Sequence, residues 1–343
     1  MKPRRLNSGD SVATVSPSWG GPAIFPHIYE SGVNFLKENG LVVKECQSTR
    51  TDPKKLYENP RMRAEDLNNA YRDPDIKAVF STIGGDDSIR ILPYLDEKAI
   101  KSNPKIIMGY SDSTTFLTYI NQMGHVTFNG PSVMAGMGQM HNYPEAANNF
   151  KRLLFKVNPT YGYKPYGVYS EGCPDWARVE SAGKVNEIKR DETGWKWLQG
   201  EALAQGELFG GCIDVLEIMK GTDFWPKKPF WIGKILFLET SEEKMPPSHV
   251  KWALRSYGMI GVFDSVVGLL IGRSRGYTED EKKKLDEEII DVVVTEFDRK
   301  DLPVVTNIDF GHTDPQFIMP LGVKMEINPL KKTLTLLESP VID

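Results

Sequence analysis

The stretch that decides the fold is Lys105–Leu117, KIIMGYSDSTTFL. It predicts a short buried strand, a sharp Gly-Tyr-Ser-Asp turn and a helix that begins near Ser113. A strand that turns directly into a helix holds the side chain at the turn, here Ser111, above the sheet edge and beside the N–H groups of the new helix. That arrangement suits a nucleophilic serine with an oxyanion hole. Serine is also a usual N-cap residue, so a capping role for Ser111 is the alternative.

Strands and helices alternate around this turn through the first half of the chain. Strands are expected at 11–16, 41–46, 77–83, 105–110 and 125–129, with helices at 27–38, 62–71, 88–95 and from 113 onward. This alternation predicts a parallel, doubly wound α/β sheet. Ligands of such sheets bind beyond the carboxyl ends of the strands, where Gly84-Gly85 and Ser111 are both expected to lie.

The second half of the chain has a different character. Strands are expected at 234–239, 266–271 and 304–308 and in a hairpin of 324–328 with 333–337, and helices at 247–257 and 279–297. This pattern predicts a mixed α+β domain. We therefore divide the chain into an N-terminal α/β domain (1–160), a linker and substrate loop (161–200) and a C-terminal domain (201–343).

Composition narrows the class of protein. With 343 residues, 40% hydrophobic and 26% charged, the chain is typical of a globular enzyme of about two domains. Its net charge of −4 gives no electrostatic case for binding nucleic acid or an anionic membrane. The three cysteines are widely separated, which fits a reducing compartment. No segment is apolar enough for a signal peptide or a membrane span, so we expect a cytoplasmic protein.

A nucleophilic serine needs a base, and the base needs an acid that orients it. Among the five histidines, His312 follows a predicted strand in the loop Asp309–Pro315, next to a glycine that suits close backbone approach. A turn histidine without a role is the alternative. Glu239 ends an apolar strand, where a buried carboxylate needs a partner. Glu242 and Glu243 follow in a loop, where they can be solvated, and we prefer Glu239.

The remaining motifs concern an oxyanion hole and cofactors. The N–H groups of Gly85 and Asp112 are candidate donors to an oxyanion, although Gly84-Gly85 can also be a plain turn. The chain has no His-Glu-x-x-His or Cys-x-x-Cys motif for a metal and no G-x-G-x-x-G after the first strand. We therefore expect neither a metal nor an organic cofactor.

With these residues assembled, the chain resembles the serine LD-carboxypeptidase family and, within it, the microcin C self-immunity branch. The matching segments are STIGGDDS, IMGYSDSTTF, GELFGGCIDVLEIMKGTDFWP, ILFLETSEE, LLIGR and NIDFGHTDPQFIMPLG, which span nearly the whole chain. The resemblance implies a Rossmann-like N-terminal domain, a C-terminal domain with a barrel-like sheet, and a homodimer. It also implies a triad in which Ser111 is the nucleophile, His312 the general base and acid, and Glu239 the residue that orients His312.

The self-immunity branch implies a nucleotide conjugate as substrate. In it a loop tryptophan stacks on the base of the substrate, and Trp195 and Trp197 are the candidates, unless both pack inside the domain. The resemblance thus favours hydrolysis of an amide-type bond in processed microcin C or related aminoacyl-nucleotide conjugates. One departure is Arg275, at a position where relatives often carry an acid.

Two other functions stay open. One is an LD-carboxypeptidase that releases the terminal D-Ala of murein tetrapeptides, for which a cationic clamp on the substrate carboxylate would be favourable. The other is a non-catalytic sugar- or nucleotide-binding module on the same scaffold, because a fold alone does not establish a function.

Overall fold

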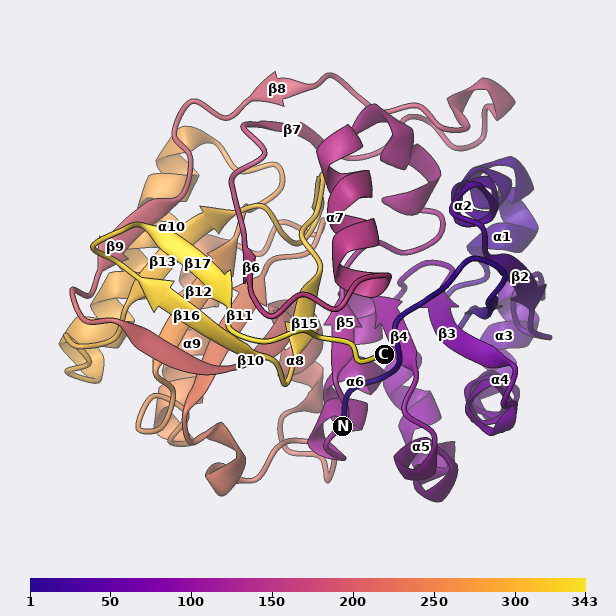
Figure 1. The fold of residues 1–343 in the computed structure, drawn as a ribbon. Helices are drawn as coiled ribbons and strands as arrows, with labels where there is room; N and C mark the ends of the chain where they lie inside the picture. The colour runs from indigo at the N-terminus through magenta and orange to yellow at the C-terminus, as the bar shows by residue number, and fades with distance from the viewer.

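The computed structural model describes residues 1–343, which form two α/β units that lie side by side (Figure 1). The N-terminal unit contains a six-stranded sheet of order β15-β5-β4-β3-β1-β2, in which the neighbouring strands of β1 to β5 are parallel. The bounds are β1 Ser11–Val15, β2 Val42–Glu45, β3 Ile76–Ser81, β4 Ile106–Gly109 and β5 Thr127–Asn129. The predicted parallel, doubly wound sheet is confirmed.

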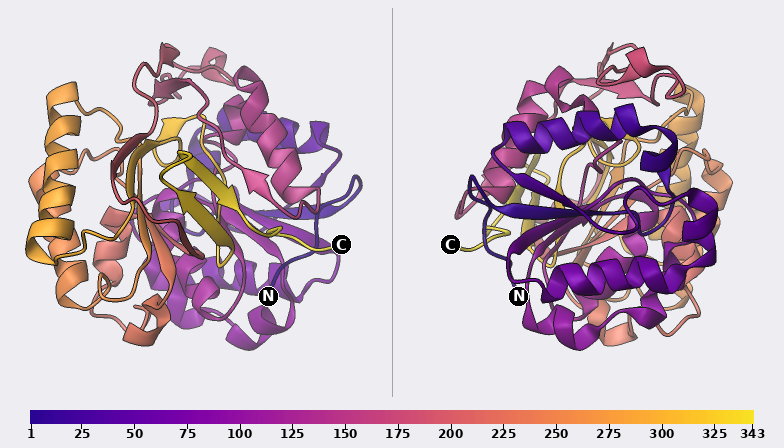
Figure 2. Two further views of the ribbon diagram at one scale, coloured as in Figure 1. Left: turned by 60° about the vertical axis from the view of Figure 1, so that its left-hand side comes forward. Right: turned by 90° about the vertical axis from the view of Figure 1, so that its right-hand side faces the viewer.

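Helices cover both faces of this sheet (Figure 2, right). The α2 helix shows why: its Ile28, Val33 and Leu36 recur on one face and are buried, as an amphipathic helix requires. The helical elements of this unit are α1 Gly21–Ile24, α2 Pro26–Glu38, α3 Pro53–Glu58, α4 Pro60–Arg72, η1 Ser88–Tyr94, α5 Glu97–Ser102, η2 Ser111–Ser113, α6 Thr114–Gln122, η3 Met137–Asn142 and α7 Pro144–Leu154.

The C-terminal unit is built on an eight-stranded mixed sheet of order β6-β17-β16-β10-β11-β12-β13-β9. Its four central strands are parallel and the outer ones antiparallel, which agrees with the predicted mixed α+β class. The strands are β6 Tyr161–Gly162, β9 Lys196–Gln199, β10 Ala204–Cys212, β11 Lys234–Glu239, β12 Gly268–Gly272, β13 Val304–Ile308, β16 Lys324–Asn328 and β17 Thr333–Leu336.

The helices of this unit are α8 Ile213–Met219, η4 Val179–Ser181, η5 Lys228–Trp231, α9 Pro247–Met259 and α10 Glu279–Ile290. The helix expected over 279–297 changes character at Asp291, where a π-helical segment (η6 Asp291–Glu296) continues it. No helix of the structure combines the length and the apolar character that crossing a membrane requires.

The strand β10 was not anticipated from the sequence, because glycines at 206, 210 and 211 mask its strand character. These glycines permit close packing. A Cβ at Gly210 would lie 1.7 Å from the Phe237 carbonyl oxygen, and one at Gly211 would lie 2.6 Å from the side chain of Thr114. The central strand of the second sheet therefore packs directly against the start of α6.

The segment 161–200 does more than connect the two units. Its β6 and β9 form the two edges of the eight-stranded sheet, while β7 (Val168–Glu171) and β8 (Lys189–Arg190) join β14 (Thr313–Asp314) in a small third sheet. The C-terminal half of the chain in turn contributes a strand to the first sheet, where β15 (Met319–Leu321) pairs with β5. Seventy-seven buried side chains from both units form one continuous hydrophobic core, so the two sheets are held in a fixed relation.

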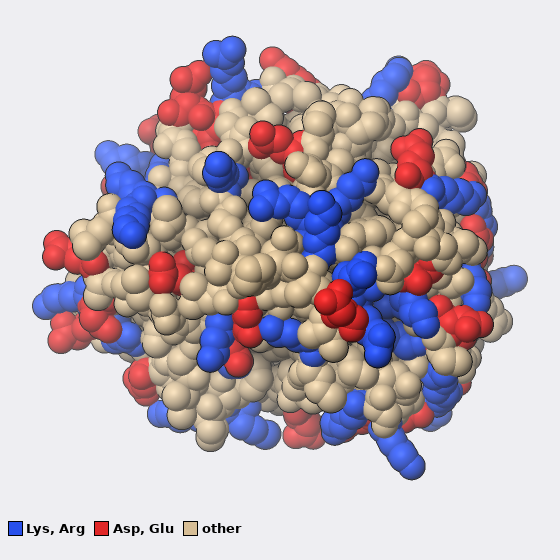
Figure 3. Space-filling view, in the orientation of Figure 1, with Lys and Arg blue, Asp and Glu red and all other residues tan.

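Acidic and basic side chains are interspersed over the face shown in Figure 3, and basic ones gather beside the two chain termini. No single sign of charge covers this face.

Candidate active site

A pocket of about 210 Å³ lies where the carboxyl ends of strands from both sheets meet. The first sheet contributes the residues that follow β1, β3 and β4, and the second those that follow β11, β12 and β13. The lining comprises Trp19, Ile83, Gly84, Gly85, Tyr110, Ser111, Ala135, Cys173, Trp176, Glu242, Arg275 and His312. Ligand binding at this edge is the general rule for open α/β sheets.

Ser111 occupies the sharp turn predicted between strand and helix. β4 ends at Gly109, a single 3-10 turn follows, and α6 begins at Thr114. Ser111 has a φ of 59°, an uncommon value for a residue other than glycine. Such a backbone conformation holds the Oγ atom out over the sheet edge. The side chain makes no capping hydrogen bond. Its Oγ lies 3.1 Å from Nε2 of His312.

His312 and Glu239 meet on the other side of the pocket. Glu239 is the last residue of β11 and 1% exposed, and its Oε2 lies 2.7 Å from Nδ1 of His312. The neighbouring Gly311 has a φ of 101°, and a Cβ there would lie 2.8 Å from Oε2 of Glu239. The predicted close backbone approach at this glycine is confirmed. The structure thus joins Ser111, His312 and Glu239 in one chain of hydrogen bonds, from three distant segments.

Glu242, one of the alternatives to Glu239, also reaches His312 but at the other ring nitrogen. Its Oε2 lies 2.9 Å from Nε2, the atom that also faces Ser111. A carboxylate beside Nε2 is attractive only when that nitrogen carries a proton, because the neutral ring with Nδ1–H presents a lone pair there. The arrangement therefore matches an imidazolium held between two carboxylates.

The electrostatics agree with this geometry. Burial acts to lower the pKa of His312, but the charges and hydrogen bonds of Glu239 and Glu242 raise it to about 10. The hydrogen bond to His312 holds the pKa of Glu242 down at about 2. Burial raises the pKa of Glu239, and the neighbouring His312 opposes that change. Before His312 can accept a proton from Ser111, Nε2 must be free of its own, so Glu242 must loosen its contact.

The candidate oxyanion donors lie beside Ser111. The Gly85 N–H has no hydrogen-bond partner within the chain, and the Asp112 N–H begins the helical turn after Ser111. A Cβ at Gly85 would lie 2.1 Å from Oγ of Ser18, and one at Gly84 would lie 3.0 Å from Cβ of Ser111. Only glycines allow this loop to approach the serine so closely.

A buried ion pair holds the same loop in place. Arg63, which is fully buried, donates two hydrogen bonds to the carboxylate of Asp87, at 2.7 and 2.9 Å. A bidentate arginine–carboxylate pair fixes orientation as well as distance. On the other side, the Asp112 carboxylate is buried and accepts a hydrogen bond from the Ser88 N–H at 2.8 Å. The segment that follows the Gly84-Gly85 turn is thereby anchored by two separate contacts, at Asp87 and at Ser88.

The structure places neither Trp195 nor Trp197 in the pocket lining. Trp195 donates its Nε1–H to Asp309 at 2.8 Å and packs edge-on against Phe317, and Trp197 lies on β9. Trp195 is held by Asp309 and Phe317 in the segment after β13, and Trp197 by the pairing of β9 with β13, which is the physical reason that neither lines the pocket. The tryptophans that line it are Trp19 and Trp176.

Trp19 and Trp176 were missed for different reasons. Trp19 follows β1 directly, so its place at the carboxyl end of a parallel strand was a usable signal. Trp176 ends the stretch 156–176, which is rich in Tyr, Gly and Pro, and the sequence there does not indicate in which direction a side chain points. The two indoles both pack against Phe25, with ring centroids 6.1 and 5.9 Å away. Trp19 and Trp176 together form an aromatic part of the pocket lining, called the aromatic wall below.

Comparison with known families agrees with this architecture. Residues 12–130 match the model of the LD-carboxypeptidase N-terminal domain, and residues 205–327 match that of the C-terminal domain. The chain belongs to the LD-carboxypeptidase family. Its fold and family make it a peptidase of the hydrolase class. No group of three or more His, Cys, Asp or Glu side chains is arranged to hold a metal ion.

Three relatives illustrate the range of the family. A carboxypeptidase-named protein of Vibrio cholerae is 30% identical over 95% of this chain and 94% of its own length. The microcin C7 self-immunity protein MccF of Escherichia coli is 29% identical over 97% of this chain and 94% of its own length. A protein of Bacillus subtilis named as a probable murein peptide carboxypeptidase is 28% identical over 97% of this chain and 93% of its own length. Among solved structures, MccF in complex with aspartyl sulfamoyl adenosine superposes with a TM-score of 0.85 at 27% identity, covering 100% of both chains.

Proposed function

We propose that this peptidase uses Ser111, His312 and Glu239 to hydrolyse an amide-type bond in processed microcin C or related aminoacyl-nucleotide conjugates, which would give self-immunity or detoxification. The observation that carries the chemistry is the hydrogen-bonded chain from Ser111 Oγ through His312 to Glu239. It links the three side chains in the sequence that a serine nucleophile requires, and Nε2 can accept the serine proton once it has lost its own. No cofactor is needed for this reaction.

The proposed reaction has two stages. Ser111 Oγ attacks the substrate carbonyl while Nε2 of His312 takes the hydroxyl proton, and Glu239 stabilises the resulting imidazolium through Nδ1–H. The N–H groups of Gly85 and Asp112 stabilise the oxyanion. His312 then passes its proton to the departing nitrogen, leaving an acyl ester on Ser111. Water, activated by His312, hydrolyses that ester in the second stage.

The aromatic wall supports a nucleotide as the remainder of the substrate. As the proposed stacking surface we now favour Trp176, together with Trp19, over Trp195 and Trp197. Trp19 and Trp176 line the pocket. An indole face binds any nucleobase, and stacking contributes about 1–3 kcal/mol per base. That the related MccF binds aspartyl sulfamoyl adenosine is consistent with this proposal.

The second candidate is an LD-carboxypeptidase that removes the terminal D-Ala from murein tetrapeptides. The observation that favours it is Arg275, a cation in the pocket lining, because this substrate presents a carboxylate and no nucleobase.

The decisive experiment incubates the purified protein with aspartyl sulfamoyl adenosine and, separately, with a murein tetrapeptide that ends in D-Ala. Products are read by mass spectrometry. Cleavage of the conjugate alone supports our proposal, and cleavage of the tetrapeptide alone supports the second candidate. If the folded protein cleaves neither but binds one of them, the non-catalytic binding module becomes the better account.

Two further properties belong to the same proposal. We expect a homodimer, to be tested by sedimentation at several protein concentrations. We also expect a cytoplasmic location, to be tested by fractionation of cells that express the protein.

A further inference from the structure

A second pocket, called the basic pocket below, lies at the end of the first sheet opposite to Ser111. It has a volume of about 340 Å³ and lies where the chain enters β3 and β4. The two chain termini lie beside it, in the region where basic side chains gather (Figure 1, Figure 3). Its lining includes four cations, Lys2, Arg4, Lys77 and Lys105, and no acidic residue. A concave site of this size with several cations can hold a small anion.

The two exposed cations of the basic pocket have no carboxylate partner. The side chain of Arg4 makes no ion pair and no hydrogen bond within the chain. Lys77 donates only to the carbonyl oxygen of Pro74, at 2.7 Å. Lys2 differs, because it pairs with Glu338 at 2.8 Å. Arg4 and Lys77 are therefore free to contact a ligand.

Lys105 is the buried cation of the basic pocket. It is 6% exposed, and its ammonium donates to the backbone carbonyls of Asp73 and Ile76, which fixes the end of α4 against the start of β3. An ammonium has three N–H donors, so one has no partner within the chain. Burial lowers the pKa of Lys105 to about 8; the charge of Lys77 acts in the same direction, and those of Asp73 and Asp75 oppose it. An anion beside such an ammonium stabilises its charged form.

The acids around the basic pocket do not cancel its charge. Three of them already lie beside a cation, in the pairs Asp73–Lys44, Asp343–Arg5 and Glu338–Lys2. Asp75, whose charge also acts on Lys105, is exposed and has no ion pair. Three unpaired cations against this one unpaired acid leave a positive surplus at the pocket, in a chain whose net charge is −4.

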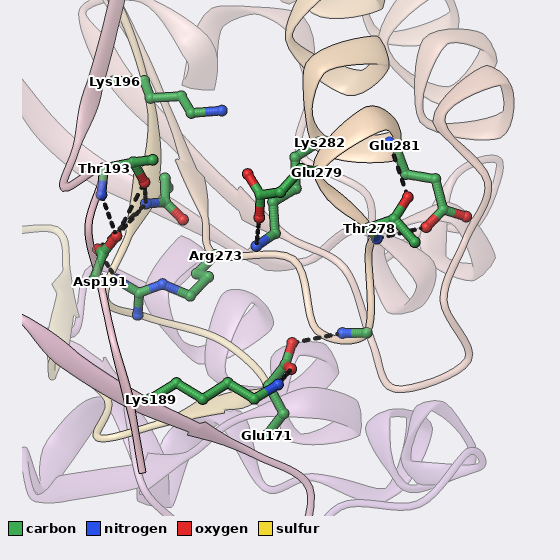
Figure 4. A network of polar contacts seen from close by, with 12 residues as sticks. Glu171, Lys189, Asp191, Thr193, Lys196, Arg273, Thr278, Glu279, Glu281 and Lys282 are labelled. Atoms are coloured by element: carbon green, nitrogen blue, oxygen red, sulfur yellow. Dashed lines mark hydrogen bonds and ion pairs between the residues drawn. The ribbon is translucent and has the colours of Figure 1, made fainter. Parts of the chain in front are cut away.

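Cations in other parts of the molecule are neutralised locally. In the network of Figure 4, Lys189 lies 2.8 Å from Glu171 and Arg273 lies 2.6 Å from Asp191. Of the 29 ion pairs in the structure, only that of Lys2 involves a residue that lines the basic pocket. The unpaired cations are therefore a property of this pocket and not of the protein surface in general.

The backbone that carries Arg4 is fixed before any ligand arrives. Arg4 forms a parallel bridge with Ile342, the Arg5 N–H donates to the carbonyl of Ile342 at 2.7 Å, and the Ile342 N–H donates to the carbonyl of Pro3 at 2.9 Å. Lys105, on the other side, is held by its own bonds to the backbone. Fixing the pocket in this way lowers the entropy lost when an anion binds.

We propose that the basic pocket binds a diphosphate group, either as free diphosphate or as part of a nucleotide. A diphosphate carries more negative charge than a carboxylate or a single phosphate in little more volume, so it suits several cations around a small pocket. Charges of both signs are interspersed over the rest of this face (Figure 3), which disfavours an extended polyanion such as nucleic acid. The inference does not rest on the proposed hydrolase function, because Lys105 precedes β4 and Ser111 follows it.

The test is isothermal titration calorimetry with inorganic diphosphate at pH 7 and low ionic strength. It compares the wild type with two double variants, Arg4→Gln/Lys77→Gln and Arg61→Gln/Lys283→Gln. Each removes two exposed cations, and Arg61 on α4 and Lys283 on α10 do not line the basic pocket. We expect the first to raise the Kd for diphosphate about 10- to 100-fold and the control to stay within about threefold. Thermal unfolding checks the fold of each variant.

The remaining arms separate this site from the catalytic pocket and identify the source of the diphosphate. Ser111→Ala should bind diphosphate as the wild type does, and monophosphate should bind at least about tenfold more weakly. ADP is titrated into Trp176→Ala, which lacks the proposed stacking surface of the catalytic pocket. ADP binding that Arg4→Gln/Lys77→Gln weakens supports a nucleotide ligand, and binding of diphosphate without ADP supports the free anion.

Three results would overturn the inference. They are no diphosphate binding by the folded wild type, equal weakening in the two double variants, and equal affinity for monophosphate and diphosphate. None of these measurements depends on turnover, so failure of the proposed hydrolase function leaves the test of the basic pocket unchanged.

Discussion

The two sheet edges that meet at the pocket contribute in different ways. The edge of the first sheet contributes backbone geometry: a serine at positive φ and a glycine turn that packs closely against it. The edge of the second sheet contributes charge, from Glu239, Glu242, Arg275 and His312. This difference indicates that nucleophilic attack by Ser111 and stabilisation of the oxyanion depend on the local conformation of the chain. Proton transfer and substrate selectivity depend instead on contacts between residues that are far apart in the sequence.

Removing the nucleophile should give the largest effect. We expect Ser111→Ala to lower kcat about 10³-fold or more, because only the oxyanion donors and substrate binding remain. Hydrolysis is followed by mass spectrometry, and thermal unfolding checks the fold. The matched control is Ser113→Ala in the same turn, which should stay within about threefold. Wild-type turnover in Ser111→Ala would remove the serine from the mechanism.

Neutralising the acid on the second sheet should have the next largest effect. Glu239→Gln keeps the shape of the side chain but removes the charge that stabilises the imidazolium, so we expect kcat to fall about 10²- to 10⁴-fold. Glu243→Gln in the neighbouring loop is the control. If the two variants were equally active, His312 would not depend on Glu239.

Changes to the aromatic wall should act on binding more than on chemistry. Trp176→Ala should raise KM for the nucleotide conjugate about 10- to 100-fold, as loss of base stacking predicts, with a much smaller effect on the tetrapeptide. Trp195→Ala removes the hydrogen bond to Asp309 and should mainly lower the melting temperature. An increase in KM for Trp195→Ala alone would return the stacking role to Trp195.

The smallest effect should be a shift of the pH profile. Because Glu239 and Glu242 raise the pKa of His312 to about 10, the free enzyme holds a protonated histidine at lower pH, and kcat/KM should rise with pH toward that value. Glu242→Gln removes one of the two charges, so the pKa of His312 should fall. The acidic limb should then move about one unit or more toward lower pH. An unmoved profile would show that Glu242 does not control this proton.

The sequence was most informative where the structure depends on neighbouring residues. The strand, turn and helix around Ser111 follow from apolar and turn residues that are adjacent in the chain, and the buried acid that ends β11 follows from a carboxylate after an apolar run. Strand β10 was missed because its glycines lower strand propensity locally, while their small size is needed only for packing against β11 and α6.

The sequence was least informative where direction depends on distant partners. Trp195 and Trp197 were the two candidates for base stacking, and the sequence did not separate them; only the hydrogen bond of Trp195 to Asp309 and the pairing of β9 with β13 show where the two side chains are held. Glu242 looked like a solvated loop residue, yet it reaches a histidine 70 positions later in the chain. Contacts of this kind have no local signature.

The most direct test of the central claim is covalent labelling by a serine-directed phosphonate, followed by peptide mapping. The account predicts a single label on Ser111 in the wild type and a greatly reduced rate of labelling in His312→Ala, since the histidine must take the serine proton. A label on another residue, or no label on a folded wild-type protein, would contradict the claim that the two sheet edges form a serine hydrolase site.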